Sequence, residues 1–334
     1  MKILFDHPFP FALAHGGFQV QIEQTRIALQ KVQVQADYVR WWDDQQSGDI
    51  IHYFGRPSVP YIQAARDRGI KVVLAELLTE LGSRSALARA AQKSFIVAAQ
   101  KILPEVFTMR MGWESFREAN ACVALTQWEA RLMVEMFRAS PEGVHVIPNG
   151  VEDVFLEEHS ATRGKWLVCT ATIADRKRVL ELAEVCVSAG APVWIIGKPQ
   201  STADPYAVRF LSFVKQHSDL VRYEGPIGDR KRLAEAYRQA RGFVLLSAWE
   251  SLSLSALEAG ACGCPLLLSD LPWARTVFGD QATYCPIGSA QTSSAVLRKF
   301  YADAPNLKPP NKPKRWVEVA QQLKTVYESL LRTS

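Results

Sequence analysis

The sequence lacks several features that would each have pointed to a different class of protein. No apolar run reaches the roughly 18 residues that a membrane-spanning helix needs. No G-x-G-x-x-G follows a predicted strand, and this absence argues against a nucleotide-dependent dehydrogenase, which would carry that glycine motif. The amino terminus meets prolines soon after Asp6 and has neither the long apolar region nor the small-residue cleavage site of a signal peptide. We therefore expect a protein that, if it meets membranes, lies on them.

Cysteine is present but is not arranged as in a disulfide-rich or zinc-binding protein. The six cysteines lie mostly within apolar runs, without the dense, regular spacing of a secreted disulfide framework, so we expect buried thiols and a cytoplasmic location. Cys262 and Cys264 form a single C-x-C with no histidine cluster nearby, and we expect no structural zinc. The net charge of +5 is only mildly basic, which favours an anionic ligand or an anionic membrane surface over nucleic acid.

What the sequence does contain is a regular alternation of short apolar runs with helix-length amphipathic segments. This alternation predicts parallel sheets with helices on both faces, and 334 residues suffice for two such domains. The predicted strands of the first series are Lys2–Phe5, Gln35–Arg40, Ile50–Tyr53, Lys71–Leu74, Ala121–Leu125 and His145–Ile147. Those of the second are Trp166–Thr170, Val193–Ile196, Val221–Tyr223, Phe243–Leu246, Leu266–Ser269 and Thr283–Cys285.

A boundary between the two predicted domains is indicated by turn residues. Pro148 and the Asn149-Gly150 turn close the first series of strands, and the polar stretch Glu157–Lys165 precedes the second. We expect domains at residues 1–157 and 158–312. The prolines between Ala304 and Pro313 exclude regular structure there, so that residues 313–334 form a terminal helix that packs back on the first domain.

The segment Ser247–Gly260 holds the residues best suited to chemistry. It follows the strand Phe243–Leu246 as a polar loop and then a helix, and ligands of such sheets bind beyond the carboxyl ends of the strands. A helix that opens near Ser253 or Ser255 offers free N–H groups to a diphosphate. Glu250 in the loop and Glu258 in the helix can then hold hydroxyls on either side of the phosphates. The alternative is that Ser253 only caps a helix and that both glutamates are solvated.

The arrangement E-x7-E, followed by Glu258-Ala259-Gly260 and the proline-led run Pro265–Ser269, resembles the glycosyltransferases of family 4, in group 1. Further similarity runs through His15-Gly16-Gly17 and the two segments Asn120–Thr126 and Val146–Val151. The resemblance implies the GT-B fold, in which two Rossmann-like domains face each other across a cleft, and transfer of a sugar from a nucleotide diphosphate sugar to an acceptor hydroxyl.

The resemblance also implies which residues hold the donor. These would be Gly16 and Gly17, whose missing side chains let the backbone approach the phosphates, together with Thr172, Arg176, Lys177, Ile227, Glu250, Ser251, Leu252, Ser253, Leu254 and Glu258. Glu250 would position a sugar hydroxyl and Glu258 the ribose. Lys177 would neutralise the departing diphosphate, unless the Arg176-Lys177-Arg178 triplet is only a solvated face. Glu250 and Lys177 are the expected catalytic pair.

Three positions depart from the family pattern. Thr172 stands where the family has an arginine, for which Arg176 would substitute, and Ser253 stands where it usually has glycine. Glu76 follows the fourth strand where many relatives have a histidine, and it either lies beside the acceptor and sugar or has no role. These departures keep a second hypothesis open, namely a catalytically silent nucleotide-sugar-binding protein of the same fold.

The expected mechanism needs no cofactor beyond the sugar nucleotide. No D-x-D occurs to hold a divalent metal on the diphosphate, so charge would be neutralised by Lys177, Arg176 and the helix N-terminus. The resemblance implies retention at the anomeric carbon.

One predicted helix of the first domain has two possible roles. The helix around Arg84–Phe107 carries an apolar series at helical spacing among basic residues, consisting of Leu87, Ala91, Phe95, Ala98, Ile102 and Val106. The series either packs on the sheet with the basic residues outside or forms a surface for a lipid-linked or anionic acceptor, in peripheral contact with a membrane.

Overall fold

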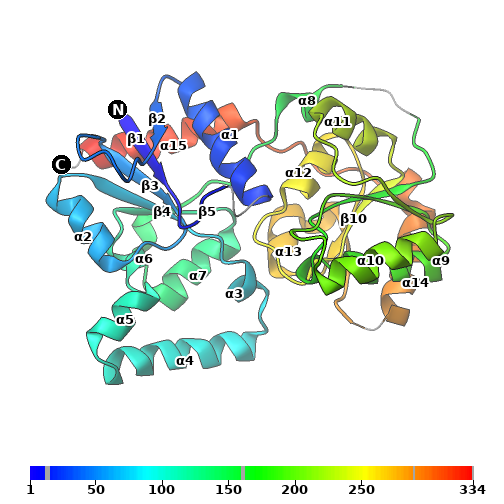
Figure 1. The fold of residues 1–334 in the computed structure, drawn as a ribbon, viewed down its shortest axis with the longest axis horizontal. Coiled ribbons are helices and arrows are strands. Elements are labelled where there is room, and N and C mark those ends of the chain that lie inside the picture. Colours follow the sequence, from blue (N-terminus) through cyan, green and yellow to red (C-terminus); the bar gives the residue numbers. More distant parts are fainter. Residues whose placement is uncertain (12–15, 159–161, 289, 333–334) are drawn as a thin grey trace. The chain divides into compact units, whose positions relative to one another are not determined.

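The computed structural model describes residues 1–11, 16–158, 162–288 and 290–332, apart from the side chains of residues 105, 106 and 110. Contacts within the chain divide it into two compact units. Unit 1 comprises Met1–Asn149 and Trp316–Ser334, and unit 2 comprises Gly150–Arg315. Each unit is built on one six-stranded sheet with helices around it (Figure 1), so the predicted α/β fold class is confirmed.

The sheet of unit 1 is wholly parallel and has the strand order β2-β1-β3-β4-β5-β6. Its strands are β1 (Lys2–Asp6), β2 (Gln35–Tyr38), β3 (Ile50–Phe54), β4 (Lys71–Ala75), β5 (Ala121–Ala124) and β6 (Val144–Val146). The central strands are buried along almost their whole length, because layers of helices shield the sheet from water. Such strands appear in a sequence as continuous apolar runs, and this is why they could be predicted.

The helices of unit 1 come from both ends of the chain. They are α1 (Gly17–Lys31), α2 (Val59–Asp67), α3 (Thr79–Ser83), α4 (Ala86–Ile102), α5 (Glu105–Met111), α6 (Ser115–Glu118), α7 (Gln127–Phe137), the 3-10 turn η1 (Pro141–Gly143) and α15 (Trp316–Arg332). Helix α15, drawn in red, packs beside α1 (Figure 1), and its Tyr327 hydroxyl lies 2.5 Å from Nδ1 of the buried His52 on β3. The terminal helix is therefore part of unit 1.

Unit 2 has a second parallel sheet, in the order β12-β11-β10-β7-β8-β9. Its strands are β7 (Leu167–Thr170), β8 (Val193–Ile196), β9 (Val221–Tyr223), β10 (Gly242–Leu245), β11 (Leu266–Ser269) and β12 (Thr283–Cys285). Its helices and 3-10 turns are α8 (Asp153–Leu156), η2 (Asp175–Lys177), α9 (Val179–Ala189), α10 (Pro205–Gln216), α11 (Arg230–Gln239), α12 (Leu254–Ala261), α13 (Pro272–Phe278), η3 (Gly279–Gln281), α14 (Ala290–Asp303) and η4 (Ala304–Asn306). All twelve predicted strands are present.

The division between the units falls slightly before the sequence-based boundary. The contacts assign Gly150–Leu156 to unit 2 because α8 packs on α11 and α12, whereas the sequence suggested a boundary after residue 157. The predicted linker Glu157–Lys165 includes residues 159–161, which lie outside the described residues. The last residues of unit 2 return beside its first ones, since Val151 donates its N–H to the carbonyl of Lys314 at 2.9 Å.

The predicted helix over Arg84–Phe107 is corrected in two respects. It is two helices, α4 and α5, because Pro104 has no N–H to continue the first. In addition, the apolar series faces outward: Leu87, Phe95 and Ile102 are 85%, 63% and 78% exposed, whereas Ile96 and Ala99 are the buried residues of α4. The expectation that this series packs on the sheet was therefore wrong, and the side chain of Val106 lies outside those described.

Candidate functional site

The loop between β10 and α12 carries both predicted glutamates. Strand β10 is fully buried, and the chain leaves it through a polar loop that ends at Ser253. The Ser253 side chain caps α12 by accepting the N–H of Ala256 at 3.3 Å, as expected for a helix that opens there. The N–H groups of Leu254 and Ser255 precede the first helical bond and point out of the helix end, where the helix dipole is positive. Helix ends of this kind are suited to binding anions.

Both glutamates are buried rather than solvated. Glu250 is 7% exposed in the loop, and Glu258 is 6% exposed one turn into α12. A carboxylate that has left water must be compensated by charge or by hydrogen bonds, because its desolvation otherwise costs several kcal/mol. The structure supplies a different cation to each of them. The reading in which both glutamates are merely solvated is excluded by this burial.

Lys177 is the partner of Glu250. The Lys177 ammonium, in the loop after β7, donates a hydrogen bond to Oε1 of Glu250, and the two side chains are 14% and 8% exposed. The backbone joins the same two loops, since the Ala248 N–H donates to the Arg176 carbonyl at 2.8 Å. The expected catalytic pair therefore lies together at the carboxyl ends of β7 and β10, which are neighbouring strands.

The other predicted donor residues lie on the same two loops. Thr172 is half-buried just beyond β7, and Arg176 is exposed in η2 with its side chain outside any ion pair among the described residues. Ser251 and Leu252 belong to the loop itself and are buried, at 4% and 6% exposure. Arg176 remains a predicted substitute for the arginine that Thr172 replaces.

Glu258 is held by residues that the sequence did not reveal. Arg230, the first residue of α11, donates Nη2 to Glu258 and Nε to Glu152 at 2.7 Å, while its guanidinium stacks on the Phe155 ring at 4.7 Å. The buried Tyr237 hydroxyl lies 3.3 Å from the second oxygen of Glu258. Burial raises the pKa of Glu258, and the adjacent Arg230 guanidinium opposes that shift. Arg230 thus bridges two carboxylates that lie far apart in sequence.

The turn that carries Ile227 is tied to the ends of β7 and β8. Gly197, after β8, donates its N–H to the Gly225 carbonyl at 3.1 Å and accepts the Tyr223 hydroxyl at 3.0 Å. Gly197 has φ of +153°, and a Cβ atom built there would lie 1.9 Å from the Ala171 carbonyl oxygen. Only glycine fits this close approach. The loops after β7, β8 and β9 are thereby locked together, with half-buried Ile227 at their rim.

The remaining predicted residues belong to unit 1. Gly16 is the N-cap of α1 with φ of +126°, Gly17 is the first residue of that helix, and their role at the donor stays a prediction. His15 lies outside the described residues. Glu76 follows β4 and accepts a hydrogen bond from Arg56 Nε at 2.6 Å, and the Arg56 guanidinium lies over the Phe137 ring at 4.6 Å. Burial raises the pKa of Glu76, against the opposing charge of Arg56.

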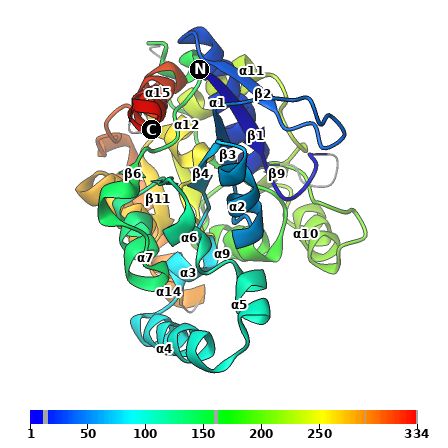
Figure 2. The same ribbon diagram turned by 90° about the vertical axis from the view of Figure 1, so that its left-hand side faces the viewer.

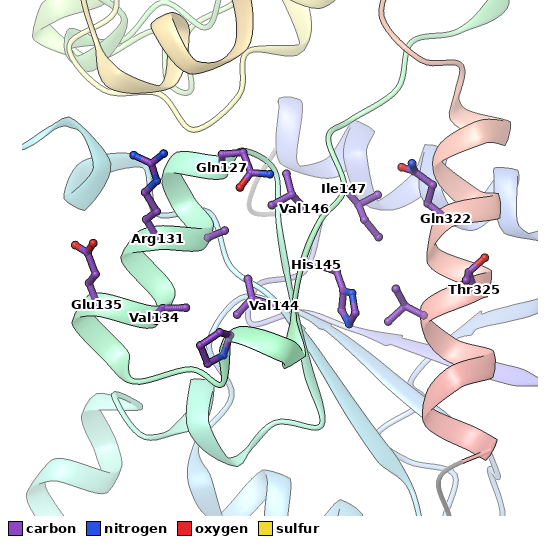
Figure 3. Close-up of a pocket in the computed structure, with 13 residues that line it drawn as sticks. Gln127, Arg131, Val134, Glu135, Val144, His145, Val146, Ile147, Gln322 and Thr325 are labelled. Carbon is purple, nitrogen blue, oxygen red and sulfur yellow. The ribbon is translucent and has the colours of Figure 1, made fainter.

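A depression of about 720 Å³ lies elsewhere in unit 1, over the edge strand β6 and between α7 and α15 (Figure 3). It contains none of the predicted site residues. Gln127 and Arg131 line it from α7, and Gln322 and Thr325 line it from α15, with His145 of β6 between them. Burial lowers the pKa of His145. Arg131 and Glu135 of α7 both line the depression, whereas the predicted site residues that the structure brings together lie on the loops of unit 2.

A comparison with known protein families matches part of unit 2. Residues 194–323 match the family model "Glycosyl transferases group 1". The matched stretch contains Glu250, Glu258 and Arg230, and it confirms the predicted resemblance to group 1 for this part of the chain. Lys177, which precedes the matched stretch, is brought to it by the fold.

Similarity to curated proteins is partial. The chain is 27% identical over 183 residues to the D-inositol 3-phosphate glycosyltransferase of Acidothermus cellulolyticus, a match that covers 48% of this chain and 41% of that protein. It is 30% identical over 226 residues to the protein of the same name from Stackebrandtia nassauensis, covering 60% of this chain and 51% of that protein. The chain thus spans about half the length of the curated relatives it matches.

Solved structures share the fold over the whole chain. The sucrose-phosphate synthase from Thermosynechococcus elongatus aligns with a TM-score of 0.76 at 16% identity, covering 100% of both chains. The Anabaena protein HepE in complex with UDP-glucose aligns with a TM-score of 0.67 at 12% identity, covering 100% of this chain and 99% of the other. These likenesses confirm the predicted GT-B fold.

Proposed function

We propose that this protein is a glycosyltransferase that moves a sugar from a nucleotide diphosphate sugar to an acceptor hydroxyl, with retention at the anomeric carbon and without a metal ion. The observation that carries the proposal is the burial of Glu250 and Glu258 on either side of the α12 N-terminus, with Lys177 bonded to Glu250. An anion-binding helix end between two buried carboxylates matches the order sugar, diphosphate, ribose along a donor. We name a UDP-sugar as the donor to test first, because HepE binds UDP-glucose.

The roles of the charged groups follow from their remaining hydrogen-bonding capacity. The Lys177 ammonium has three donors and gives one to Glu250, so two remain for phosphate oxygens of the leaving diphosphate. Each carboxylate has about four acceptor positions, and Arg230 and Tyr237 occupy two of those on Glu258. The others can accept the two ribose hydroxyls. Glu250 would likewise hold a sugar hydroxyl while it orients Lys177.

Charge that develops on the departing diphosphate would be met by fixed dipoles and cations. The free N–H groups of Leu254 and Ser255 and the Lys177 ammonium are positioned before the reaction starts, and such preorganised groups lower the barrier most effectively. Arg176 would add a second cation. Because the sequence has no D-x-D, we propose that these protein groups replace a divalent ion. Glu76, held by Arg56, is our proposed contact on the acceptor side.

The state of the cysteines bears on where the protein is located. All six cysteines are free and five of them are buried, as expected in a reducing compartment, so we place the protein in the cytoplasm. Among the described residues, no helix is long and apolar enough to cross a bilayer. We propose peripheral contact with the inner face of a membrane and no nucleic-acid partner.

The test is turnover of the donor. Purified protein is incubated with UDP-glucose and other sugar nucleotides, with and without EDTA, and release of the nucleoside diphosphate and the anomer of the freed sugar are followed by NMR. We expect EDTA-insensitive release with retained configuration, reduced about 100-fold in Lys177→Ala. Lys215→Ala, an exposed lysine on α10, is the matched control. Donor binding without any turnover, on a panel of acceptors, would instead support the silent nucleotide-sugar-binding protein.

A further inference from the structure

Helix α4 presents an apolar stripe to solvent. Its members follow one another at intervals of three or four residues, and they are Leu87, Ala91, Phe95, Ala98 and Ile102; we call them the α4 face. Leu103, Phe107 and Met111, at 45%, 55% and 55% exposure, extend the apolar surface toward α5. Contiguous exposed apolar surface of this kind marks an interaction site, since isolated apolar residues are normal on a surface but continuous stripes are not.

The orientation of α4 is fixed by its opposite side. Ile96 and Ala99 are buried in unit 1, Ser85 caps the helix by accepting the Ala88 N–H at 3.3 Å, and the Arg89 guanidinium lies over the Trp128 ring at 4.6 Å. In both views α4 lies at the margin of unit 1, with the sheet on its inner side (Figures 1 and 2). The α4 face is therefore held outward by packing.

The charged residues of α4 itself are all basic. The sequence from Leu81 to Pro104 contains four basic residues and no acidic one. Arg84 pairs with Glu80, and Arg89 is engaged with Trp128. Lys93 and Lys101 are exposed, and no carboxylate of the described residues lies within ion-pair distance of either. With Ala98 and Ile102, these two lysines line a shallow depression of about 470 Å³.

We propose that the α4 face docks unit 1 on an anionic lipid bilayer, with α4 lying in the plane of the interface. A helix whose apolar stripe is flanked by lysines and free of acids suits a surface that is apolar inside and negatively charged outside. A second copy of this chain fits less well, because a two-fold contact through the same face would bring Lys93 and Lys101 against lysines of its own kind. The docking surface lies wholly within unit 1.

Docking would bring the acceptor side of unit 1 to the membrane. Glu76 and α4 belong to the same connection between β4 and β5, so a docked α4 holds that connection at the lipid surface. The surface is separate from the buried groups around Glu250, and vesicle binding does not depend on whether those groups bind a sugar nucleotide. The proposal makes the peripheral membrane contact of the proposed function specific to α4, and its failure would leave the proposed sugar transfer untouched.

The experiment is flotation of the full chain with vesicles of phosphatidylcholine alone or with about a third phosphatidylglycerol. We expect the protein to float with the anionic vesicles at least about tenfold more than with the neutral ones, and about 0.5 M salt to reduce binding. Leu87→Gln with Phe95→Gln and Ile102→Gln should abolish flotation, and Lys93→Glu with Lys101→Glu should remove the preference for anionic lipid.

Two matched variants control for general changes in surface character. Trp41→Gln with Trp42→Gln removes two residues that are 74% and 82% exposed elsewhere in unit 1. Lys215→Glu with Lys299→Glu makes the same change in net charge on unit 2. Both should float as the wild type does. Equal flotation of the α4 variants, or loss in the controls as well, would overturn the proposal.

Two further measurements keep the test decisive if the triple variant folds poorly. Ile102→Cys labelled with an environment-sensitive dye should shift to the blue on addition of anionic vesicles, whereas a label at Val208→Cys on α10 should not. Light scattering after gel filtration gives the oligomeric state without lipid. A wild-type dimer that the Ile102→Gln change converts to a monomer would assign the face to a second copy and refute membrane docking.

Discussion

The ammonium of Lys177 and the carboxylate of Glu250 meet at the carboxyl ends of two neighbouring strands, although they lie 73 positions apart in the sequence. Both side chains are nearly buried, so each is the counter-charge that lets the other leave water. The β10 loop therefore holds a buried ion pair in addition to the residue that caps α12. It ties the predicted phosphate-binding cation to the carboxylate predicted to hold the sugar.

Removal of the Lys177 ammonium should lower the stability of the protein even without a ligand. In Lys177→Ala the Glu250 carboxylate stays buried without its partner, and we expect the free energy of unfolding to fall by about 1–3 kcal/mol. Adding Glu250→Gln should recover most of that loss, because a neutral amide no longer needs the cation. Urea unfolding of the single and double variants measures this, with Lys215→Ala as the control. A double variant no more stable than Lys177→Ala would show that the pair carries no coupling.

Arg230 should control both the affinity for the donor and its pH dependence. In Arg230→Ala, Glu258 loses its cation, and its pKa, already raised by burial, rises further. We expect UDP to bind about tenfold more weakly, and to bind more weakly still as the pH falls from 8 to 6, because the protonated carboxyl is a poorer acceptor for ribose hydroxyls.

Calorimetric titration at several pH values tests this prediction. Glu235→Ala, an exposed glutamate on the same helix, is the matched control and should keep the wild-type affinity throughout. Arg230→Lys should not restore the affinity, because an ammonium cannot bridge Glu152 and Glu258 as the guanidinium fork does. Full affinity in Arg230→Ala would mean that Glu258 needs no help to stay ionised.

Gly197 should be irreplaceable. The added Cβ of Gly197→Ala would clash with the Ala171 carbonyl oxygen, which would lie only 1.9 Å away. We expect a loss of at least about 3 kcal/mol of stability together with loss of UDP binding. Gly228→Ala, in the turn that carries Ile227, meets no atom within 4 Å and should change stability by less than about 1 kcal/mol. Thermal unfolding of the two variants compares them. Equal melting temperatures would contradict the close approach of the β7 and β8 loops.

His52 should make the protein sensitive to mild acid. Burial lowers the pKa of His52 to about 3 in the folded state, against 6.5 for the free side chain. The unfolded state therefore binds the extra proton first, and the stability is complete above pH 6.5 and lost at up to about 1.4 kcal/mol per pH unit between 6.5 and 3.

The slope of stability with pH can be assigned to this residue. Replacing His52 and its partner Tyr327 together by phenylalanine removes both polar groups and should flatten the dependence, while His217→Asn should not. Urea unfolding at pH 7 and pH 5 measures the difference. An unchanged slope in the double variant would place the acid sensitivity elsewhere.

The sequence predicted the strands well because buried parallel strands are continuous apolar runs. It also placed Glu250, Lys177 and Glu258 at one edge of a sheet, since a strand followed by a polar loop identifies that edge. Arg230 and Tyr237 were missed because no local pattern distinguishes an arginine that reaches 28 residues along the chain from one that is solvated. The predicted donor residue Ile227 lies in the Gly225–Asp229 turn, which leads directly into the helix that Arg230 begins. The nearness of Arg230 to Ile227 in the sequence was therefore the available signal.

The orientation of α4 could not be predicted for a different reason. Helical periodicity shows that apolar residues share a face, but it does not say whether that face meets the core or the solvent. The buried residues of α4 are Ile96 and Ala99, which are fewer than the residues of the α4 face and yet pack inward. Only the tertiary structure supplies that information.

The central claim is that the loops of unit 2 bind a sugar nucleotide through Glu258 and Lys177 without a metal. The most direct test is calorimetric titration of UDP, GDP and ADP, each with and without an attached sugar, in EDTA, into the wild type and Glu258→Ala. We predict that one nucleotide binds in the micromolar range, about −8 kcal/mol, and that the mutant loses at least about tenfold in affinity. Binding of none of them, or equal binding by wild type and mutant, would contradict the assignment.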